Sequence, residues 1–296
     1  MKSNWFLNIF ILLLLSMGAE SSLAQGLIIS QKDGTQIKVP YEQLDYVTVY
    51  EGEEKPKEKK VVSSISIEGE DSRRSYDFFY NKNNQLIKIN YIEESFGKMS
   101  EESNINYSTN EEIDIKVHSV VWGSEIITES NVLLNQFGNA VSITSKRTGI
   151  ENYDSDCKYT YDNPEILKQF AISNSSGTSV YDFIWNQERI AKIIADKDSE
   201  FMKEYSFTYT EIPNKYNIDL NWLLLFSQFE VPANEENAFL IMGLIKQQGK
   251  SCKCMLKSIQ NTNNSFNTDF SYECDQNGYI NKITTSQGNT FSINYK

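Results

Sequence analysis

The chain has 296 residues, and its 28 Lys and Arg against 40 Asp and Glu give a formal net charge of −12. This acidity argues against nucleic acid or an anionic membrane surface as a partner, because both would repel the protein. The 17 Tyr and 16 Phe favour β-strands, where aromatic rings fit the pleated surface.

Residues 1–24 are typical of a secretory signal peptide. Lys2 precedes an apolar run from Trp5 to Leu15, and Ser22-Leu23-Ala24 supplies small residues at a cleavage site. The run is shorter than the roughly 20 apolar residues that a membrane-spanning helix needs. No Cys precedes Cys157, so we expect an exported protein, periplasmic or extracellular, without a lipid anchor or a membrane span.

Residues 25–50 are predicted to form a short N-terminal β segment. Asp33-Gly34 is a strong hairpin turn pair between two apolar runs, and Tyr46–Tyr50 is a candidate third strand. The following residues, 51–60, read EGEEKPKEKK and cannot bury themselves. They are predicted to be a linker to a second domain, residues 61–296.

The second domain repeats one phrase: an aromatic-rich strand, a short polar turn, and a strand ending in Ile. Apolar residues alternate with polar ones along these strands, which indicates a sheet with one buried face and one solvent-exposed face. Successive hairpins without long crossovers predict an antiparallel meander. The copies are Phe78–Asn81 with Leu86 and Ile89, Leu134-Asn135 with Ala140 and Ile143, Tyr161-Asp162 with Leu167 and Phe170, Trp185-Asn186 with Ile190 and Ile193, and Cys274-Asp275 with Ile280 and Ile283.

The alternation stops after Pro213 and helical spacing replaces it. Ile218, Trp222, Leu225 and Phe226 share one helical face, with Asn217 as the expected N-cap. A second helix is expected from Pro232 onwards, although 238–245 also fits a buried strand. Because a long meander has an apolar face that must be covered, we predict an open or partly closed barrel-like sheet. One or two helices at about 217–246 would pack in its concave side, with those four side chains as a structural plug.

Two stretches resemble known families. Gln31–Thr35, followed by Pro40, resembles a segment found after the signal in many exported Bacteroidetes proteins. The region from Val61 to Lys296, with its insertion at Asn217–Leu224, resembles an uncharacterised Bacteroidetes domain family described as having a porin-like fold. Its hairpins also resemble degenerate YD repeats, with Tyr-Asp kept at Tyr161-Asp162. The resemblance implies an exported β-rich domain and supplies no activity or functional residues.

Charged residues occur on both faces of several predicted strands, among them Glu68–Tyr80 and Asn104–Val117. A membrane barrel instead shows apolar bands toward lipid. The porin-like label therefore describes shape.

Residues that carry chemistry are sparse. If the strands around 261–264 pair, Cys252 falls opposite Cys274, which predicts a cross-strand disulfide. The alternative, Cys252 and Cys254 as half of a metal site, lacks further ligands, since His118 is the single His. Nucleophile-elbow and phosphate-loop motifs are absent from the sequence, and we expect no catalytic residues, metal site or cofactor.

We therefore predict an exported, non-enzymatic module of the periplasm or cell surface that binds a glycan or protein partner or has a structural role. The alternative is a carbohydrate-active enzyme or a glycan-binding accessory protein, because 40 acidic residues could supply two carboxylates across a groove. Aromatic rings in Tyr76–Tyr80 and Tyr181–Trp185 could stack on a sugar or peptide, or form cross-strand ladders within the sheet.

Overall fold

The computed structural model describes residues 26–30, 36–40, 60–95, 97–150, 152–200, 202–226, 236–262 and 267–296. The predicted signal peptide, the candidate third strand and nearly all of the linker lie outside these ranges. The chain divides into two compact units, 1–58 and 59–296. In the first unit, β1 (Gly26–Ser30) and β2 (Gln36–Pro40) pair antiparallel, with Gly26 opposite Pro40.

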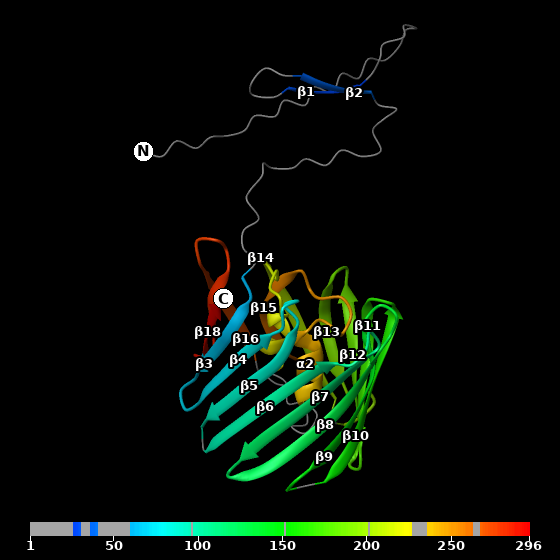
Figure 1. The fold of residues 1–296 in the computed structure, drawn as a ribbon, viewed down its shortest axis with the longest axis vertical. Helices are drawn as coiled ribbons and strands as arrows, with labels where there is room; N and C mark the ends of the chain where they lie inside the picture. Colours follow the sequence, from blue (N-terminus) through cyan, green and yellow to red (C-terminus); the bar gives the residue numbers. More distant parts are fainter. Residues whose placement is uncertain are drawn as a thin grey trace. The chain divides into compact units, whose positions relative to one another are not determined.

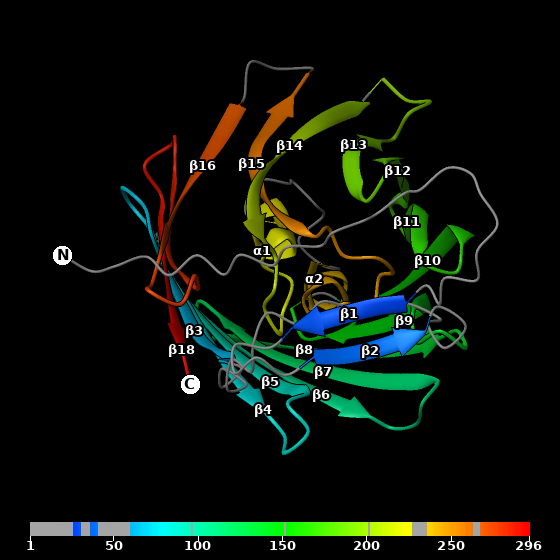
Figure 2. The same cartoon turned by 90° about the horizontal axis from the view of Figure 1, so that it is seen from above.

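The second unit is a closed barrel of 16 strands, each antiparallel to its neighbours in sequence (Figures 1 and 2). The barrel closes where β18 pairs with β3, with Ile293 opposite Ile65. The predicted meander is confirmed, and its closure is complete. The strands are β3 (Val62–Glu68), β4 (Arg73–Tyr80), β5 (Leu86–Glu94), β6 (Lys98–Tyr107), β7 (Glu112–Val121), β8 (Ser124–Leu134), β9 (Ala140–Thr148), β10 (Tyr153–Asn163), β11 (Ile166–Asn174), β12 (Gly177–Asn186), β13 (Arg189–Ala195), β14 (Lys203–Pro213), β15 (Cys254–Asn261), β16 (Asn267–Cys274), β17 (Ile280–Thr285) and β18 (Thr290–Tyr295).

The period-two alternation places apolar side chains inside the barrel and charged side chains outside. On β7, Ile113, Ile115 and Val117 are buried, whereas Asp114 and Lys116 point the other way. Ion pairs join neighbouring strands on the outer wall, including Lys88 to Glu102 at 2.6 Å and Lys116 to Glu129 at 2.8 Å. The outer wall is therefore polar along the strands that carry these pairs.

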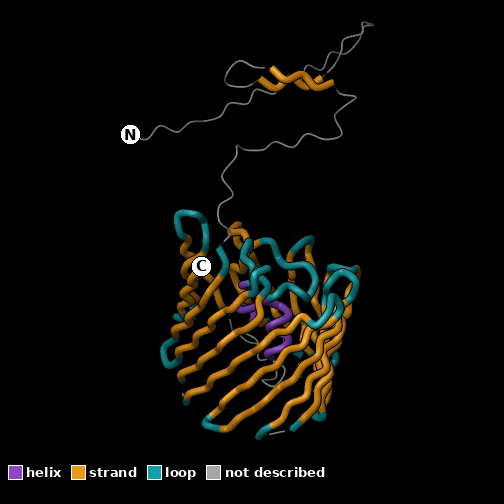
Figure 3. The backbone as a smooth tube through the Cα atoms, viewed as in Figure 1, coloured by secondary structure: helices purple, strands orange, loops and turns teal. Residues whose placement is uncertain are grey.

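Two helices fill part of the lumen (Figures 2 and 3). The segment between β14 and β15 contains α1 (Leu220–Phe226) and α2 (Glu236–Leu244), so residues 238–244 are helical. Of the predicted plug residues, Ile218, Trp222 and Leu225 are buried. Phe226 ends α1, and its side chain lies outside the described part of the chain.

The two helices pack closely at Trp222. Its ring meets that of Phe239 edge-on, with 5.4 Å between centroids. On the other side it lies against Gly243, where an added Cβ would come within 2.6 Å of the indole. The absence of a side chain at Gly243 thus sets how near α2 approaches α1.

The start of α1 differs from the prediction. Asp219, not Asn217, caps the helix, because its Oδ1 accepts the backbone N–H of Asn221 at 3.0 Å. Asn217 instead accepts the N–H of Val62 at 2.9 Å and so ties the insertion to the first strand of the barrel.

The repeated phrase corresponds to a repeated hydrogen bond, which we call the aromatic clasp. At or near the end of an even-numbered strand, a Tyr hydroxyl or Trp N–H donates to the carbonyl at or near the start of the preceding odd-numbered strand. β8 is the exception, because Leu134 occupies that position. The seven clasps are Tyr80 to Val62, Tyr107 to Leu86, Tyr161 to Ala140, Trp185 to Leu167, Tyr209 to Ile190, Tyr272 to Leu256 and Tyr295 to Ile280.

Candidate functional site

A set of polar side chains interrupts the apolar inner wall of the barrel on strands β4 to β10. Each of them is an even number of residues away from a buried core residue of its own strand, and therefore lies on the same face of the sheet. Tyr76 is related in this way to Phe78, and Tyr91 to Ile89. We call this set the inner belt: Arg74, Tyr76, Tyr91, Glu93, Glu101, Ser103, Ser119, Thr128, Ser130, Ser145, Arg147, Tyr153 and Ser155.

The inner belt and the helices lie toward opposite ends of the barrel. The belt occupies the last residues of β5, β7 and β9, whereas the helical insertion leaves the wall after β14. Because consecutive strands run antiparallel, odd-numbered and even-numbered strands end at opposite rims. On β10, Ser155 lies four residues, or about 13 Å along the strand, from Tyr159, whose ring stacks on Phe239 of α2.

Arg74, Tyr91 and Glu93 form the charged part of the inner belt. The Arg74 Nε donates to Glu93 Oε1 at 3.2 Å, and the Tyr91 hydroxyl donates to Glu93 Oε2 at 2.7 Å. Burial opposes the charged guanidinium, but the Glu93 carboxylate together with Tyr91 and Tyr76 raises the pKa of Arg74. Burial, with Tyr76 and Glu93 beside it, raises the pKa of Tyr91, so its hydroxyl stays a hydrogen-bond donor.

Glu101 on the neighbouring strand is the second inward carboxylate. Its two oxygens accept hydrogen bonds from Ser119 at 3.1 Å and Ser103 at 3.3 Å. Both oxygens of Glu93 and of Glu101 thus already accept hydrogen bonds from the chain.

A row of hydroxyl groups continues the inner belt across β8, β9 and β10. Ser130 lies opposite Ser145, with 2.7 Å between the two hydroxyl oxygens, and Ser145 lies opposite Ser155. Ser155 is 2% exposed, and its hydroxyl has no hydrogen-bond partner among the described residues. Buried polar groups are nearly always paired, so this hydroxyl is available to a water molecule or a ligand.

Arg147 and Tyr153 complete the inner belt. The Arg147 guanidinium donates to the Tyr153 hydroxyl at 3.2 Å and lies over the same ring, 5.4 Å from its centroid. On the far side of the belt, the rings of Tyr76 and Tyr91 meet at 4.8 Å with a tilt of 38°. The belt therefore combines aromatic rings, hydrogen-bond donors and acceptors, and both positively and negatively charged side chains.

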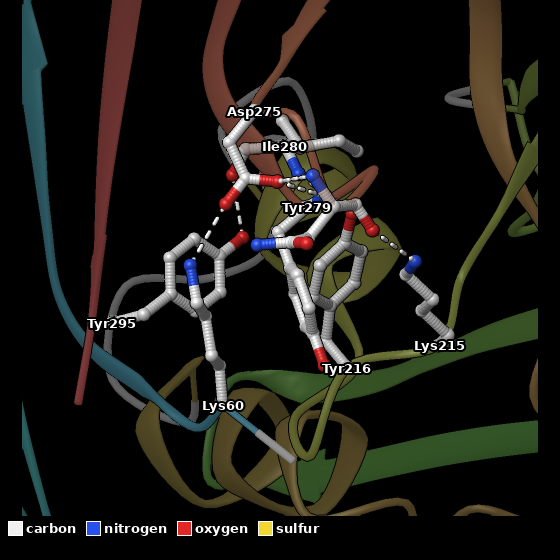
Figure 4. A network of polar contacts seen from close by, with 8 residues as sticks. Lys60, Lys215, Tyr216, Asp275, Tyr279, Ile280 and Tyr295 are labelled. Atoms are coloured by element: carbon white, nitrogen blue, oxygen red, sulfur yellow. Dashed lines mark hydrogen bonds and ion pairs between the residues drawn. The ribbon is translucent and has the colours of Figure 1, made fainter. Parts of the chain in front are cut away.

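A second polar cluster lies at the opposite rim (Figure 4). Lys60 donates to Asp275 Oδ2 at 2.8 Å, and Asp275 Oδ1 accepts the N–H groups of Asn277 and Tyr279. The Lys60 hydrogen bond and the backbone N–H groups lower the pKa of Asp275 to about 2. Lys60 also lies over the rings of Tyr279 and Tyr295. This cluster ties the chain just before β3 to the turn between β16 and β17 and to Tyr295 of β18, so its role is structural.

The four cysteines are free thiols in the structure. Cys252 is buried, whereas Cys274 is exposed. Between β15 and β16, Ser258 lies opposite Asp269, and this register differs by one residue from the one that would place Cys252 opposite Cys274. Burial raises the pKa of Cys252 to about 11, which keeps it an unreactive thiol. The disulfide stays a prediction.

Across the described ranges, three or more Cys, His, Asp or Glu never gather in a way that could hold a metal ion. Among the described residues, no helix is long and apolar enough to cross a bilayer.

Comparisons with known proteins place the fold. The structure is similar to a porin-like protein from Bacteroides uniformis ATCC 8492, with a TM-score of 0.61, 14% sequence identity, and coverage of 79% of this chain and 98% of that one. It is also similar to a porin-like protein from Bacteroides vulgatus ATCC 8482, with a TM-score of 0.55, 11% identity, and coverage of 80% and 99%. No protein-family model and no curated protein matches the sequence. The chain thus has a porin-like fold.

Proposed function

We propose that this protein is an exported, non-enzymatic binding module whose barrel is surrounded by water and whose inner belt holds a ligand. The observation that carries the proposal is the direction of the alternation: charged residues on the outer wall, an apolar core inside, and a polar belt within that core. A barrel built to sit in lipid has the reverse arrangement, with apolar residues outside and polar residues inside.

The outer wall supports the aqueous part of the proposal. Lys192 pairs with Glu204 at 2.6 Å and Lys282 with Glu273 at 2.8 Å, on strands far from the pairs of β5 to β8. A charged side chain facing lipid near the bilayer centre costs about 2–4 kcal/mol for Lys or Arg. Charge around the wall therefore favours water on its outside.

The location and family follow from the sequence and the fold together. The predicted signal peptide favours export, and the absence of a Cys behind it favours a protein without a lipid anchor. The likeness to porin-like Bacteroides proteins supports membership of the uncharacterised Bacteroidetes family that the sequence resembles. On this view the shared shape is a scaffold, and the α1–α2 segment occupies the lumen that a pore would need.

The non-enzymatic part rests on the two inward carboxylates. Glu93 is held by Arg74 and Tyr91, and Glu101 by two serines, so each serves as a fixed acceptor. Fixed acceptors suit ligand binding, where geometry matters and no proton has to move.

Neighbouring residues that point in opposite directions allow a matched test. Glu101 points inward and Glu102 outward, so Glu101→Gln and Glu102→Gln make the same chemical change on the two faces of β6. Thermal-shift measurements with neutral oligosaccharides, anionic oligosaccharides, short peptides and nucleotides would be compared between the two variants. We expect one probe class to stabilise the wild type and Glu102→Gln but not Glu101→Gln. Equal responses of both variants to every class would overturn the proposal.

A further inference from the structure

We infer that the ligand of the inner belt is a neutral saccharide and that Trp122, at the rim beside the belt, is the surface on which a sugar ring stacks. The inference rests on the proposed binding function and adds the chemical class of the ligand and a residue outside the belt. Three observations carry it: the charge balance of the belt, its supply of hydroxyl groups, and the placement of Trp122.

The charges of the inner belt cancel. Arg74 and Arg147 contribute two positive charges, and Glu93 and Glu101 contribute two negative charges, so the belt as a set is neutral. Arg74 is already paired with Glu93. A site for phosphate or for an acidic sugar would present an excess of positive charge. The balance therefore favours a neutral ligand.

The polar groups of the belt match a polyhydroxyl compound. A sugar hydroxyl both donates and accepts, so it needs donors and acceptors placed side by side. The belt provides carboxylate oxygens at Glu101 on β6, hydroxyls at Ser119 on β7 and Ser130 on β8, and the phenol of Tyr153 on β10. The buried Ser155 hydroxyl, which the described residues leave without a partner, supplies one more group to a ligand.

Trp122 is held in an exposed position at the belt's end of the barrel. It follows β7 in a two-residue turn with Gly123, where Val121 lies opposite Ser124. Its φ is 50°, and the residue is 80% exposed. A positive φ raises the conformational energy of a bulky residue, and because the ring is exposed, its burial does not offset that energy.

The neighbouring turn makes room for the indole. A Cβ on Gly97 would lie 2.5 Å from the Trp122 Nε1, so the ring rests where a larger residue could not be accommodated. One edge of the indole thus lies against the turn between β5 and β6, while most of the ring stays open. An open aromatic face beside polar groups suits the apolar C–H face of a sugar ring.

The test uses an aromatic residue at each end of the barrel. Trp122→Ala removes the proposed stacking surface, and Phe137→Ala removes an aromatic residue that is 55% exposed in the turn between β8 and β9, at the other rim. Calorimetric titration with neutral oligosaccharides should give at least tenfold weaker binding for Trp122→Ala and unchanged binding for Phe137→Ala. Gly97→Ala displaces the indole without removing it, and should weaken binding too. Circular dichroism checks that each variant is folded.

The outcomes separate the two proposals. If an anionic oligosaccharide or a peptide, and no neutral saccharide, binds the wild type but not Glu101→Gln, the saccharide assignment is overturned while the inner belt stands as the site. If neutral saccharides bind equally to Trp122→Ala and Phe137→Ala, the role of Trp122 is overturned. If no probe class distinguishes Glu101→Gln from Glu102→Gln, the binding function itself fails.

Discussion

The hydroxyl of Tyr161 donates a hydrogen bond to the backbone carbonyl of Ala140, 2.7 Å away on the neighbouring strand. Both residues belong to the repeated phrase of the sequence, but to successive copies of it. The aromatic position of one copy thus reaches the residue that begins the second strand of the copy before. Repetition of this bond ties neighbouring hairpins together along one rim of the barrel, except at β8, where Leu134 has no group to donate.

Removing one clasp should have a small and specific cost. In Tyr161→Phe the ring still packs but the hydrogen bond is lost, so we expect the free energy of unfolding to fall by about 1 kcal/mol. Urea denaturation measures the difference. Thr160→Ala, on the exposed face of the same strand, serves as the control and should change the free energy by less than about 0.5 kcal/mol. Equal effects of the two substitutions would contradict a stabilising role for the clasp.

Two glycines that both lie against a Trp should respond differently to alanine. In Gly243→Ala the new Cβ meets the buried ring of Trp222, 2.6 Å away between α1 and α2. Overpacking of this kind costs about 1–3 kcal/mol, and the better helix propensity of Ala returns up to about 1 kcal/mol. We expect a net loss in the free energy of unfolding.

In Gly97→Ala the new Cβ meets the indole of Trp122, which is exposed and can swing aside. The free energy of unfolding should therefore stay within about 0.5 kcal/mol of the wild type. Denaturation of both variants by urea compares them directly. A larger loss for Gly97→Ala than for Gly243→Ala would show that the helices are not tightly packed at Trp222.

Asp275 should contribute to the acid sensitivity of the fold. Its pKa is lowered to about 2 in the folded protein by the hydrogen bonds from Lys60 and two backbone N–H groups, against about 3.9 in an unfolded chain. A lowered folded pKa means that the stabilisation is complete above about pH 4 and disappears as the pH falls toward 2.

The variant Asp275→Asn keeps an oxygen that can accept the two N–H groups but loses the charge facing Lys60. The melting temperature of the wild type should exceed that of Asp275→Asn at pH 6, and the difference should vanish near pH 2. A difference that is the same at both pH values would assign the effect to something other than this carboxylate.

The sequence predicts the antiparallel meander and the buried helical segment because both depend on local patterns. Alternation of apolar residues identifies each strand, and the spacing of Ile218, Trp222 and Leu225 identifies a buried helical face. Closure of the barrel depends on β18 pairing with β3, whose residues are more than 200 positions apart, as with Asn294 and Ser64. No local pattern specifies that pairing, so an open sheet was as consistent with the sequence as a closed one.

The inner belt could not be recognised from the sequence for a related reason. Strands such as β6 carry polar residues at both parities, with Glu101 inside and Glu102 outside. Which set of alternating residues faces the lumen becomes evident only from the pairing of each strand with its neighbours, where apolar residues identify the inner face. The helpful signal was Ile105 and Tyr107 at the end of β6, since they share the parity of Glu101. Alternation indicates which aromatic side chains face the core but gives no sign of their hydrogen bonds, although several of them donate to a backbone carbonyl.

The central claim is that water surrounds the barrel and that helices occupy its lumen. Sedimentation of the exported chain without detergent, combined with conductance measurements on a planar bilayer, tests it most directly. We expect a single sharp sedimenting species in plain buffer and no conductance steps when the protein is added to the bilayer. Aggregation that only detergent prevents, together with stepwise conductance, would contradict the claim.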